Sequence, residues 1–513
     1  MQKLRLRLLS TATLVCLFGG CAVGPDFHRP APPPSAGYQP RKLVAHDDQQ
    51  TFVQGLDIPG QWWTLFHSRQ LDSAVRRALA ANPTLQAAQA ALRQARENVY
   101  AQEGSFFPSL DASFAPSRTK TATRSVSIAS ANGSPYFNLF TGQLSASYTP
   151  DIFGANRRQV ESLVAQADQQ RFQLEAAYLT LSASLVTACI NEASLRAQID
   201  ETRRIVAIEA DLLAVLNRQN ALGQIAQVDV LAQRTALAQA QALLPPLQKQ
   251  LDQQRDALAS LLGAPPDQVI AETFALGDIT LPAQLPVTLP AALVDQRPDV
   301  RQAEANLHAA SAQVGVAIAN RLPVLNLTAQ GGTQANYFND MFASGNGFWM
   351  LAASVTQPVF DGGTLLHKAR AAWAALDQAK AQYRSTTLAA FQNVADTLAA
   401  LQTDADALAA AVTAEKAAGE TLRIVQLQVS LGQVAYLGIL NAQQTALQAE
   451  LALVQARAGR LADSAALFQA LGGGWWHRDD LQVTDIRGND PLAVIGVHEE
   501  GHGTLHPELK PGP

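Results

Sequence analysis

The chain contains LGQIA at residues 222–226 and LGQVA at residues 431–435, two closely similar pentapeptides that lie 209 residues apart. The same offset relates the LG pair at residues 262–263 to the LG pair at residues 471–472. Self-similarity at one long period is the signature of a repeated structural unit. These stretches therefore predict a fold built from two copies of one unit of roughly 210 residues.

Paired prolines mark the first helix of each predicted copy. Pro83 and Pro108 bracket one helical stretch, and Pro298 and Pro323 bracket another, with a common offset of 215 residues. Proline is favoured in the first turn of a helix and is excluded from its interior, so such a pair marks a start and a limit. We expect each copy to run as a helix, two strands, a long helix, a turn and a second long helix.

Four segments have the period-two alternation of β-strands, with apolar side chains on one face and small polar ones on the other. That pattern is typical of a barrel wall between lipid and water, whereas a soluble sandwich needs many more strands. The apolar sets are Leu110, Ala112 and Phe114; Leu144, Ala146 and Tyr148; Leu325, Leu327 and Ala329; and Trp349, Leu351, Ala353 and Val355.

Four strands cannot close a barrel, and an open sheet edge is not viable in hydrocarbon. Closure must therefore come from several chains. Two chains would give an eight-stranded barrel, whose interior is filled by its own side chains. Three chains would give a twelve-stranded barrel, which leaves an open lumen. If the protein conducts, we expect a mixed α/β membrane protein whose homotrimer forms a 12-stranded transmembrane β-barrel with four strands per chain.

The first long helix is predicted by a stretch without Gly or Pro. Residues 156–220 form one such stretch, and ~60 helical residues extend over roughly 90 Å. Residues 365–431 and 436–471 repeat the arrangement in the second copy. A heptad seam with three polar interruptions predicts left-handed supercoiling against neighbouring helices. The seam consists of Leu174, Tyr178, Leu181, Leu185, Ala188, Glu192, Leu195, Ile199, Thr202, Val206, Glu209 and Leu213.

The N-terminus reads as a secretory signal peptide over residues 1–20, with basic residues before a short apolar stretch. That stretch is too short to span a membrane. The sequence FGGC at residues 18–21 resembles a bacterial lipobox and makes Cys21 the expected site of covalent lipid, although Phe18 stands where Leu is usual. The alternative is an ordinary signal peptide with an incidental cysteine. The Pro-rich residues 24–40 read as an extended tether.

Composition and motifs argue against several other functions. With 38 basic and 43 acidic residues, the net charge of −5 offers no basic field for nucleic acid. Residues 498–502 read HEEGH, a literal zincin pattern, but the glycines around them oppose the required helix, so we expect a solvated tail. Cys189, alone in a helical stretch, is expected to be a small buried apolar residue. We therefore expect no enzyme activity, no metal site and no cofactor other than the lipid.

Three further stretches resemble the TolC-type outer membrane factor family, and within it the NodT-like lipoproteins of RND-type efflux systems. Residues 21–30 read CAVGPDFHRP, residues 62–66 begin with Trp62-Trp63 and end with Phe66, and residues 467–475 read LFQALGGGW. The resemblance covers roughly residues 21–476. It implies a trimer in which a twelve-stranded pore in the outer membrane is continuous with a long periplasmic α-helical coiled-coil barrel of twelve helices. This barrel is implied to dock to a periplasmic adaptor and to an inner-membrane RND-type transporter.

The same resemblance implies functional residues at the periplasmic end. In the family, the helix after the second turn narrows the tunnel with an apolar residue, which corresponds to Leu437 here. Most members also have a ring of Asp side chains, and this chain has Asn441 at that position. Some members have a further carboxylate where this chain has Gly438. A gate here should therefore be steric and hydrogen-bonded rather than ionic. The turns implied to meet the adaptor consist of Leu222, Gly223 and Gln224, and of Leu431, Gly432 and Gln433.

The sequence thus predicts a passive exit duct for drugs, metals or other small molecules. The same fold serves type I protein secretion, and a purely structural coiled-coil lipoprotein or a peripheral zincin-like enzyme are alternatives of other classes. The exported substrate is not encoded in any recognisable motif. The expected divisions are a signal peptide (1–20), a lipidated extended tether (21–60), a first repeat (61–270), a linker (271–296), a second repeat (297–476) and a flexible tail (477–513).

Overall fold

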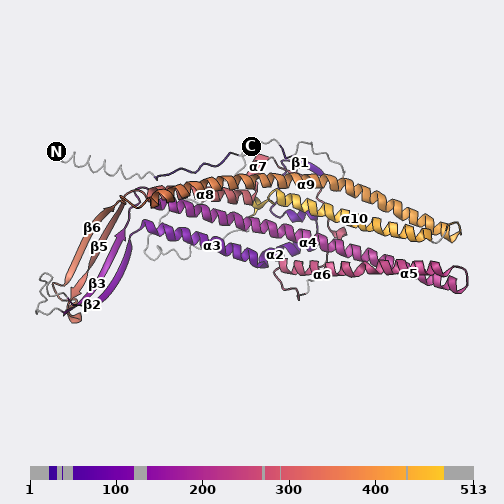
Figure 1. Ribbon diagram of the computed structural model, residues 1–513, viewed down its shortest axis with the longest axis horizontal. Helices are drawn as coiled ribbons and strands as arrows, with labels where there is room; N and C mark the ends of the chain where they lie inside the picture. The colour runs from indigo at the N-terminus through magenta and orange to yellow at the C-terminus, as the bar shows by residue number, and fades with distance from the viewer. Residues whose placement is uncertain are drawn as a thin grey trace.

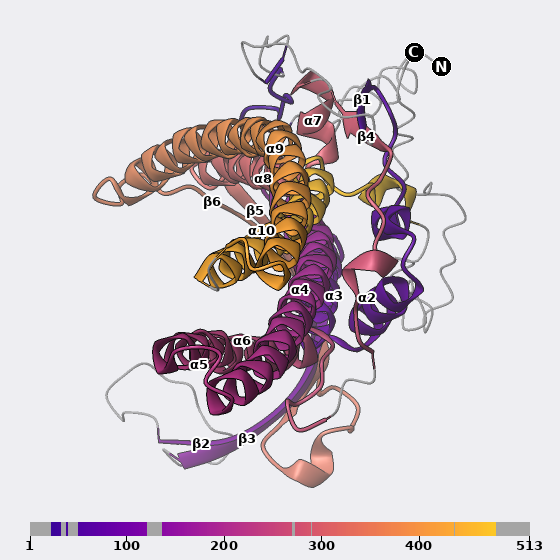
Figure 2. The same cartoon turned by 90° about the vertical axis from the view of Figure 1, so that its right-hand side faces the viewer.

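The protein is elongated, with a β-sheet at one end and the tips of two helical hairpins at the other (Figure 1). The computed structural model describes residues 22–31, 37–38, 50–120, 136–268, 272–288, 290–434 and 437–478. The predicted lipidation site Cys21, the signal peptide and the HEEGH stretch lie outside the described residues. Viewed along the long axis, the helices form a curved layer rather than a closed bundle (Figure 2).

The first half of the chain follows the predicted element order. Pro83 begins a helix and the strands come next, as the proline and alternation patterns indicated. The elements are β1 (Thr51–Gln54), η1 (Trp62–Phe66), α2 (Arg69–Ala81), α3 (Pro83–Glu103), η2 (Gly104–Phe106), β2 (Ser109–Lys120), β3 (Tyr136–Tyr148), α4 (Ala155–Ala221), α5 (Gln227–Ala242) and α6 (Leu244–Leu261).

The second half repeats this order, with a long helix of the same length. The helices α4 and α9 have 67 residues each, so that each extends over about 100 Å at the α-helical rise. The elements are η3 (Leu276–Asp278), β4 (Gln284–Val287), α7 (Pro290–Gln296), α8 (Pro298–Ala319), β5 (Val324–Ala335), η4 (Phe338–Asp340), β6 (Gly347–Thr356), α9 (Thr364–Ser430), α10 (Leu437–Ala470) and η5 (Trp475–His477).

One part of the predicted order needs correction. The second long helix of the first copy is divided at Leu243 into α5 and α6, whereas α10 is continuous over 34 residues. The cause is Pro245 and Pro246, which lie in the first turn of α6. Proline lacks the backbone N–H and its ring clashes with the preceding turn, so a single straight helix cannot continue through this position.

The predicted heptad seam of α4 is confirmed, because each of its residues is buried or half-buried. Its three polar interruptions all have partners. The Glu192 carboxylate lies 2.6 Å from Nε of Arg196, Thr202 donates to the carbonyl of Gln198 at 2.7 Å, and the Glu209 carboxylate accepts from the amide of Gln233. By length and composition α4 could cross a membrane, but 56% of its apolar stretch is buried inside the protein, as in a core helix.

A small parallel sheet joins the two halves beside the helices. Strand β1 pairs with β4 so that Thr51 faces Gln284 and Gln54 faces Val287. The side-chain amide of Gln50 donates to the carbonyl of Pro282 at 3.1 Å. The sequence predicts a tether and a linker in these regions, and its local patterns do not indicate the pairing. These regions therefore form part of the packed body of the protein.

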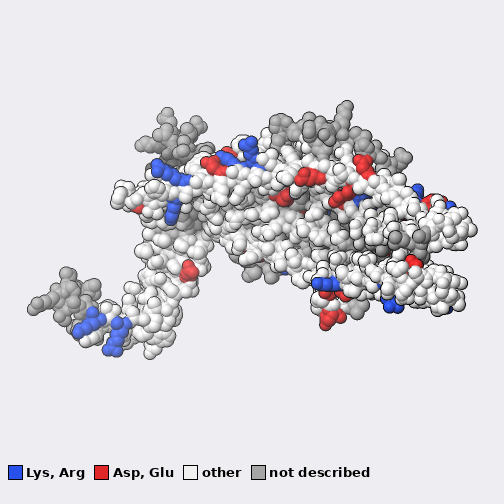
Figure 3. All heavy atoms as spheres, turned by 45° about the vertical axis from the view of Figure 1, so that its right-hand side comes forward, with Lys and Arg blue, Asp and Glu red and all other residues white. Residues whose placement is uncertain are grey.

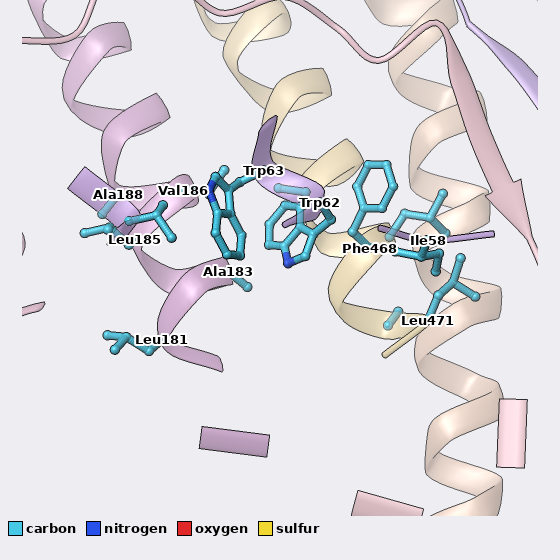
Figure 4. Close-up of a cluster of buried hydrophobic side chains, with 14 of the residues drawn as sticks. Ile58, Trp62, Trp63, Leu181, Ala183, Leu185, Val186, Ala188, Phe468 and Leu471 are labelled. Carbon is cyan, nitrogen blue, oxygen red and sulfur yellow. The ribbon is translucent and has the colours of Figure 1, made fainter. Parts of the chain in front are cut away.

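A buried aromatic cluster surrounds Trp62. This side chain is 1% exposed, and its ring stacks on Phe468 with centroids 5.5 Å apart (Figure 4). The segment that follows α10 closes over it with three consecutive glycines at positive φ, residues 472–474. A Cβ on Gly474 would lie 2.4 Å from the carbonyl oxygen of Ile58. The GGG sequence is therefore required by close backbone packing.

Candidate functional site: sheet, helix tips and strap

The four long strands form one antiparallel sheet in the order β2-β3-β5-β6. Directly paired residues in an antiparallel sheet have their side chains on the same face. The register pairs Ala112 with Leu144, Leu144 with Gly331, and Gly331 with Trp349. The four apolar sets predicted separately therefore lie on one continuous face.

That apolar face is uncovered in the single chain, where Trp349 is 78% exposed and Leu351 is 72% exposed. The opposite face is polar at the same level, because Ser145 pairs with Asp111 on one side and with Gln330 on the other. A large exposed apolar surface opposite a polar one is unsuitable for water on both sides. The sheet thus has the two-sided character of a membrane barrel wall.

The sheet also ends in two unpaired edges within the described residues, namely β2 and β6. Backbone N–H and C=O groups along an edge strand need partners, and in hydrocarbon water cannot supply them. A four-stranded arc of this kind therefore requires neighbouring strands from other chains if it is to lie in a membrane.

The two hairpin tips have the same backbone geometry. Gly223 and Gly432 both have φ of +72°, which confirms the positive φ expected of these glycines. In the first tip, Gly223 N–H donates to the carbonyl of Asn220 and Gln224 N–H to that of Gln219; the second tip has the equivalent pair. This is the Schellman pattern that ends a helix.

Each tip also exposes a leucine, because Leu222 is 72% exposed and Leu431 is 62% exposed. The residues expected to meet a partner, 222–224 and 431–433, thus lie at the free ends of the hairpins, far from the sheet (Figure 1). Exposed apolar side chains on paired, equivalent turns are suited to contact with another protein.

The gate residues expected from the family resemblance lie in the first turns of α10. Leu437 begins this helix, but its side chain lies outside the described part of the protein, as do residues 435 and 436. Asn441 is exposed to solvent. Gly438 packs closely, since a Cβ there would lie 3.0 Å from Cγ1 of Val434. One chain alone thus leaves the Asn441 amide free to face a neighbour.

The N-terminal strap, defined here as residues 22–31, was expected to be an extended tether. It is extended, but it is also docked on α4 and α8. The N–H of Val23 donates to the carbonyl of Phe153 at 3.1 Å. Arg158 of α4 donates to the carbonyl of Val23 at 3.2 Å, and its Nη2 lies 2.5 Å from Oδ1 of Asp26.

Aromatic and charged contacts extend this docking to α7 and along α8. The ring of Phe27 stacks on His308 with centroids 4.3 Å apart, and Arg29 forms ion pairs with Asp295 and, at 3.1 Å, with Glu304. The hydrogen bond and charge of Arg158 lower the pKa of the Asp26 carboxyl below its usual value. The GPDFHRP motif thus has a structural explanation that the sequence alone did not supply.

A pair of acidic residues lies between α9 and α10 near the small parallel sheet. Burial, together with the neighbouring Asp463 carboxyl, raises the pKa of Asp404 to about 7, although Arg460 opposes the shift. Arg460 also donates to the side chain of Gln50 at 2.9 Å. Sequence reasoning missed this pair, because the two acids are 59 residues apart and no motif connects them.

Among the described residues there is no group of three or more His, Cys, Asp or Glu side chains arranged to hold a metal ion. Cys189 is fully buried, and burial raises the pKa of its thiol, so it has the inert apolar environment expected from the sequence. The expectation that no metal or cofactor is used stays a prediction.

Long curved helices continued by a sheet with one apolar face define a protomer of an outer-membrane channel. The sequence profile of the family described as outer membrane efflux protein matches residues 74–264 and 289–473. The chain belongs to this family and is an outer-membrane efflux protein. It is thus a component of an outer-membrane efflux channel, and the absence of enzyme activity stays a prediction.

Known proteins resemble the chain over most of its length. The toluene efflux pump outer membrane protein TtgC of Pseudomonas putida is 28% identical over 478 residues, 92% of this chain and 96% of that protein. The pyoverdine export outer membrane protein OpmQ of Pseudomonas aeruginosa is 28% identical over 421 residues, 81% and 87% of the two chains. The solved outer-membrane channel OprN aligns with a TM-score of 0.80 at 25% identity, covering 89% of this chain and all of that one.

Proposed function

We propose that three copies of this chain form a passive exit duct, with a 12-stranded barrel in the outer membrane and a helical tunnel across the periplasm. The observation that carries the proposal is the continuous apolar face of a sheet with two unpaired edges, β2 and β6. Each edge can pair with the opposite edge of a neighbour, which closes the ring without exposing backbone to lipid. The curvature of the helical layer agrees with this arrangement (Figure 2).

The two helix tips are proposed to contact a periplasmic adaptor that connects the duct to an inner-membrane RND-type transporter. Support comes from the equivalent turns at Gly223 and Gly432 and from the exposed leucines beside them. Equivalent tips in three chains would present six similar surfaces to a ring of adaptor chains.

A gate is proposed at the start of α10. Leu437 and Asn441 are four residues apart on one helix, and side chains with this spacing share a helical face. Three copies around an axis would form an apolar ring next to an amide ring. The adaptor would open the tip only to the extent that it binds the open form more tightly.

The transported molecules are proposed to be small, such as drugs, metals or other small solutes. The names of the relatives refer to toluene and to pyoverdine, which differ widely in chemistry. A shared duct with a neutral constriction suits such variety better than a specific binding site does. These names also favour small-molecule efflux over type I protein secretion.

The experiment that tests the proposal is single-channel recording in planar bilayers without adaptor. The variant Leu437→Ala/Asn441→Ala should raise the conductance of the trimer, because smaller side chains widen the constriction. The matched control Leu388→Ala/Asn393→Ala changes the same residue types at exposed positions of α9, and it should leave conductance unchanged. An intact trimer with unchanged conductance in the first variant would place the constriction elsewhere.

A further inference from the structure

The apolar face of the sheet carries a hollow of about 640 Å³ that lies over the middle of β2 and β3 and over the part of β5 near its end at Ala335. The segment between β5 and β6 folds back over this face, where Phe338 contacts Phe114 and Phe140 with ring centroids 6.1 and 5.9 Å apart. Met341 beside it is buried, whereas Phe342 is 89% exposed. The hollow is thus an apolar cleft between the sheet and this aromatic segment.

Glycines make the floor of this hollow. Gly142 and Gly331 stand at positions whose side chains would point to the apolar face, because they pair with Phe114 and Trp349. A Cβ on Gly331 would meet nothing closer than a backbone oxygen at 3.9 Å. Above Gly142 the space is partly occupied by Met341, because a Cβ there would lie 3.0 Å from its Cε, so the open room lies above Gly331.

Two cations lie on the same face, four and six residues farther along β2 than Phe114, which is roughly 13 and 20 Å at the rise of a strand. Side chains alternate along a strand, so Phe114, Arg118 and Lys120 of β2 share one side. Figure 3 shows basic side chains gathered at this end of the sheet. Among the described residues of the four strands and the β5–β6 connection, the acidic ones are Asp111, on the opposite face, and Asp340.

We propose that this hollow binds an acyl chain of an anionic, phosphate-bearing membrane lipid whose phosphate lies at Arg118 and Lys120. The inference rests on the proposed function, in which the apolar face contacts lipid and the helices lie in the periplasm. The end of the sheet with Arg118 is then in the outer leaflet. A neighbouring chain is a poorer occupant, because it would join along strand edges, whereas the hollow extends across β2, β3 and β5.

The order of features along β2 supports a lipid. Apolar residues are followed by an aromatic zone and then by cations, which matches the order of acyl chains, interface and charged headgroup. Lys120 lies 5.3 Å from the ring centre of Tyr136, so this cation is held at the rim of the interface. Phosphate oxygens form strong charge-assisted hydrogen bonds with such groups.

Native mass spectrometry of the purified full chain in mild detergent tests this inference. The probes are lipid A, a glucosamine lipid with two phosphates and several acyl chains, and its dephosphorylated form. The unaltered trimer should retain the phosphorylated lipid at least about tenfold better, since charge-assisted contacts to two cations are lost without phosphate. Equal retention of the two lipids would overturn the proposal, and this comparison needs no variant.

Two variants separate headgroup from acyl-chain binding. Arg118→Gln/Lys120→Gln should remove the preference for phosphate, whereas the charge-matched control Lys249→Gln/Lys416→Gln, on exposed helix positions, should keep it. Gly331→Leu should fill the hollow and lower retention of both lipids. Undiminished retention in either test variant would contradict the inference. Trimer mass and conductance, measured on the same samples, report separately on the proposed function.

Discussion

Gly24 of the N-terminal strap and Gly315 of α8 are in direct backbone contact. A Cβ added to Gly24 would lie 2.5 Å from Cα of Gly315, and Gly24 itself has φ of +104°. No L-amino acid side chain fits such an approach without movement of one of the two segments. The glycine of the GPD motif is therefore explained by contact with a helix almost three hundred residues away.

The first prediction concerns this contact. In Gly315→Ala the new Cβ would lie 2.8 Å from the carbonyl oxygen of Val23 and 2.8 Å from Cγ of Arg158. Overpacking of this kind should lower the free energy of unfolding by about 1–3 kcal/mol and loosen the strap. Hydrogen exchange should become faster at the Val23 amide. Gly419→Ala is the control, because its Cβ would meet nothing within 4 Å, and unaltered exchange in both variants would refute strap docking.

A second prediction concerns the helix tips. Gly223→Ala and Gly432→Ala should each destabilise the chain by about 1–2 kcal/mol, because the left-handed conformation penalises a Cβ. No neighbouring atom lies within 4 Å of either new Cβ, so the effect is backbone strain alone. Gly104→Ala, at φ of −54° and also in open space, should be neutral or slightly stabilising. Denaturant unfolding measures all three, and equal stability would show that the tips do not need positive φ.

The third prediction is a pH dependence of stability. The pKa of Asp404, raised to about 7 by burial and by Asp463, exceeds its value of about 3.9 in an unfolded chain. The native state therefore binds the extra proton, so this contribution to stability is complete below about pH 4 and is lost as pH rises through about 7. Asp404→Asn should raise the free energy of unfolding at pH 8 by up to about 1 kcal/mol, the scale for partly exposed groups. The gain should vanish at pH 4, and a pH-independent gain would contradict the account.

The fourth prediction is lipidation of Cys21, which precedes the described strap. Cells grown with a radioactive fatty acid should label the protein, and Cys21→Ser should abolish this label, because the thiol is the attachment point. Cys189→Ser, at the buried cysteine, is the matched control and should keep the label. Persistent labelling of Cys21→Ser would mean that the cysteine is incidental.

Local patterns were sufficient to predict much of this fold. The apolar and polar faces of the strands follow from the alternation of side chains along the sequence. The turns at Gly223 and Gly432 follow from the preference of glycine for the positive φ that ends a helix. Both features depend only on residues that are close in sequence. The division between α5 and α6 was also encoded, by Pro245 and Pro246, but the long repeat obscured it. The register joining Leu144 to Gly331 was not predictable locally, because it pairs strands from the two halves of the chain.

The remaining features depend on contacts between distant segments. Thr51 pairs with Gln284, and Phe27 stacks on His308, yet nothing near these residues in sequence specifies the partner. A Pro-rich extended stretch has the same composition whether it is free or docked. Only packing against α4 and α8 distinguishes the two states, so the sequence alone predicts a simple tether.

Three chains are proposed to complete one barrel, and native mass spectrometry of the detergent-solubilised protein measures their number. We expect a single species with the mass of three chains, because the edges β2 and β6 must pair with each other across protomers. A monodisperse monomer that retains its helical content would rule out this assembly, since a four-stranded sheet with open edges cannot form the duct alone.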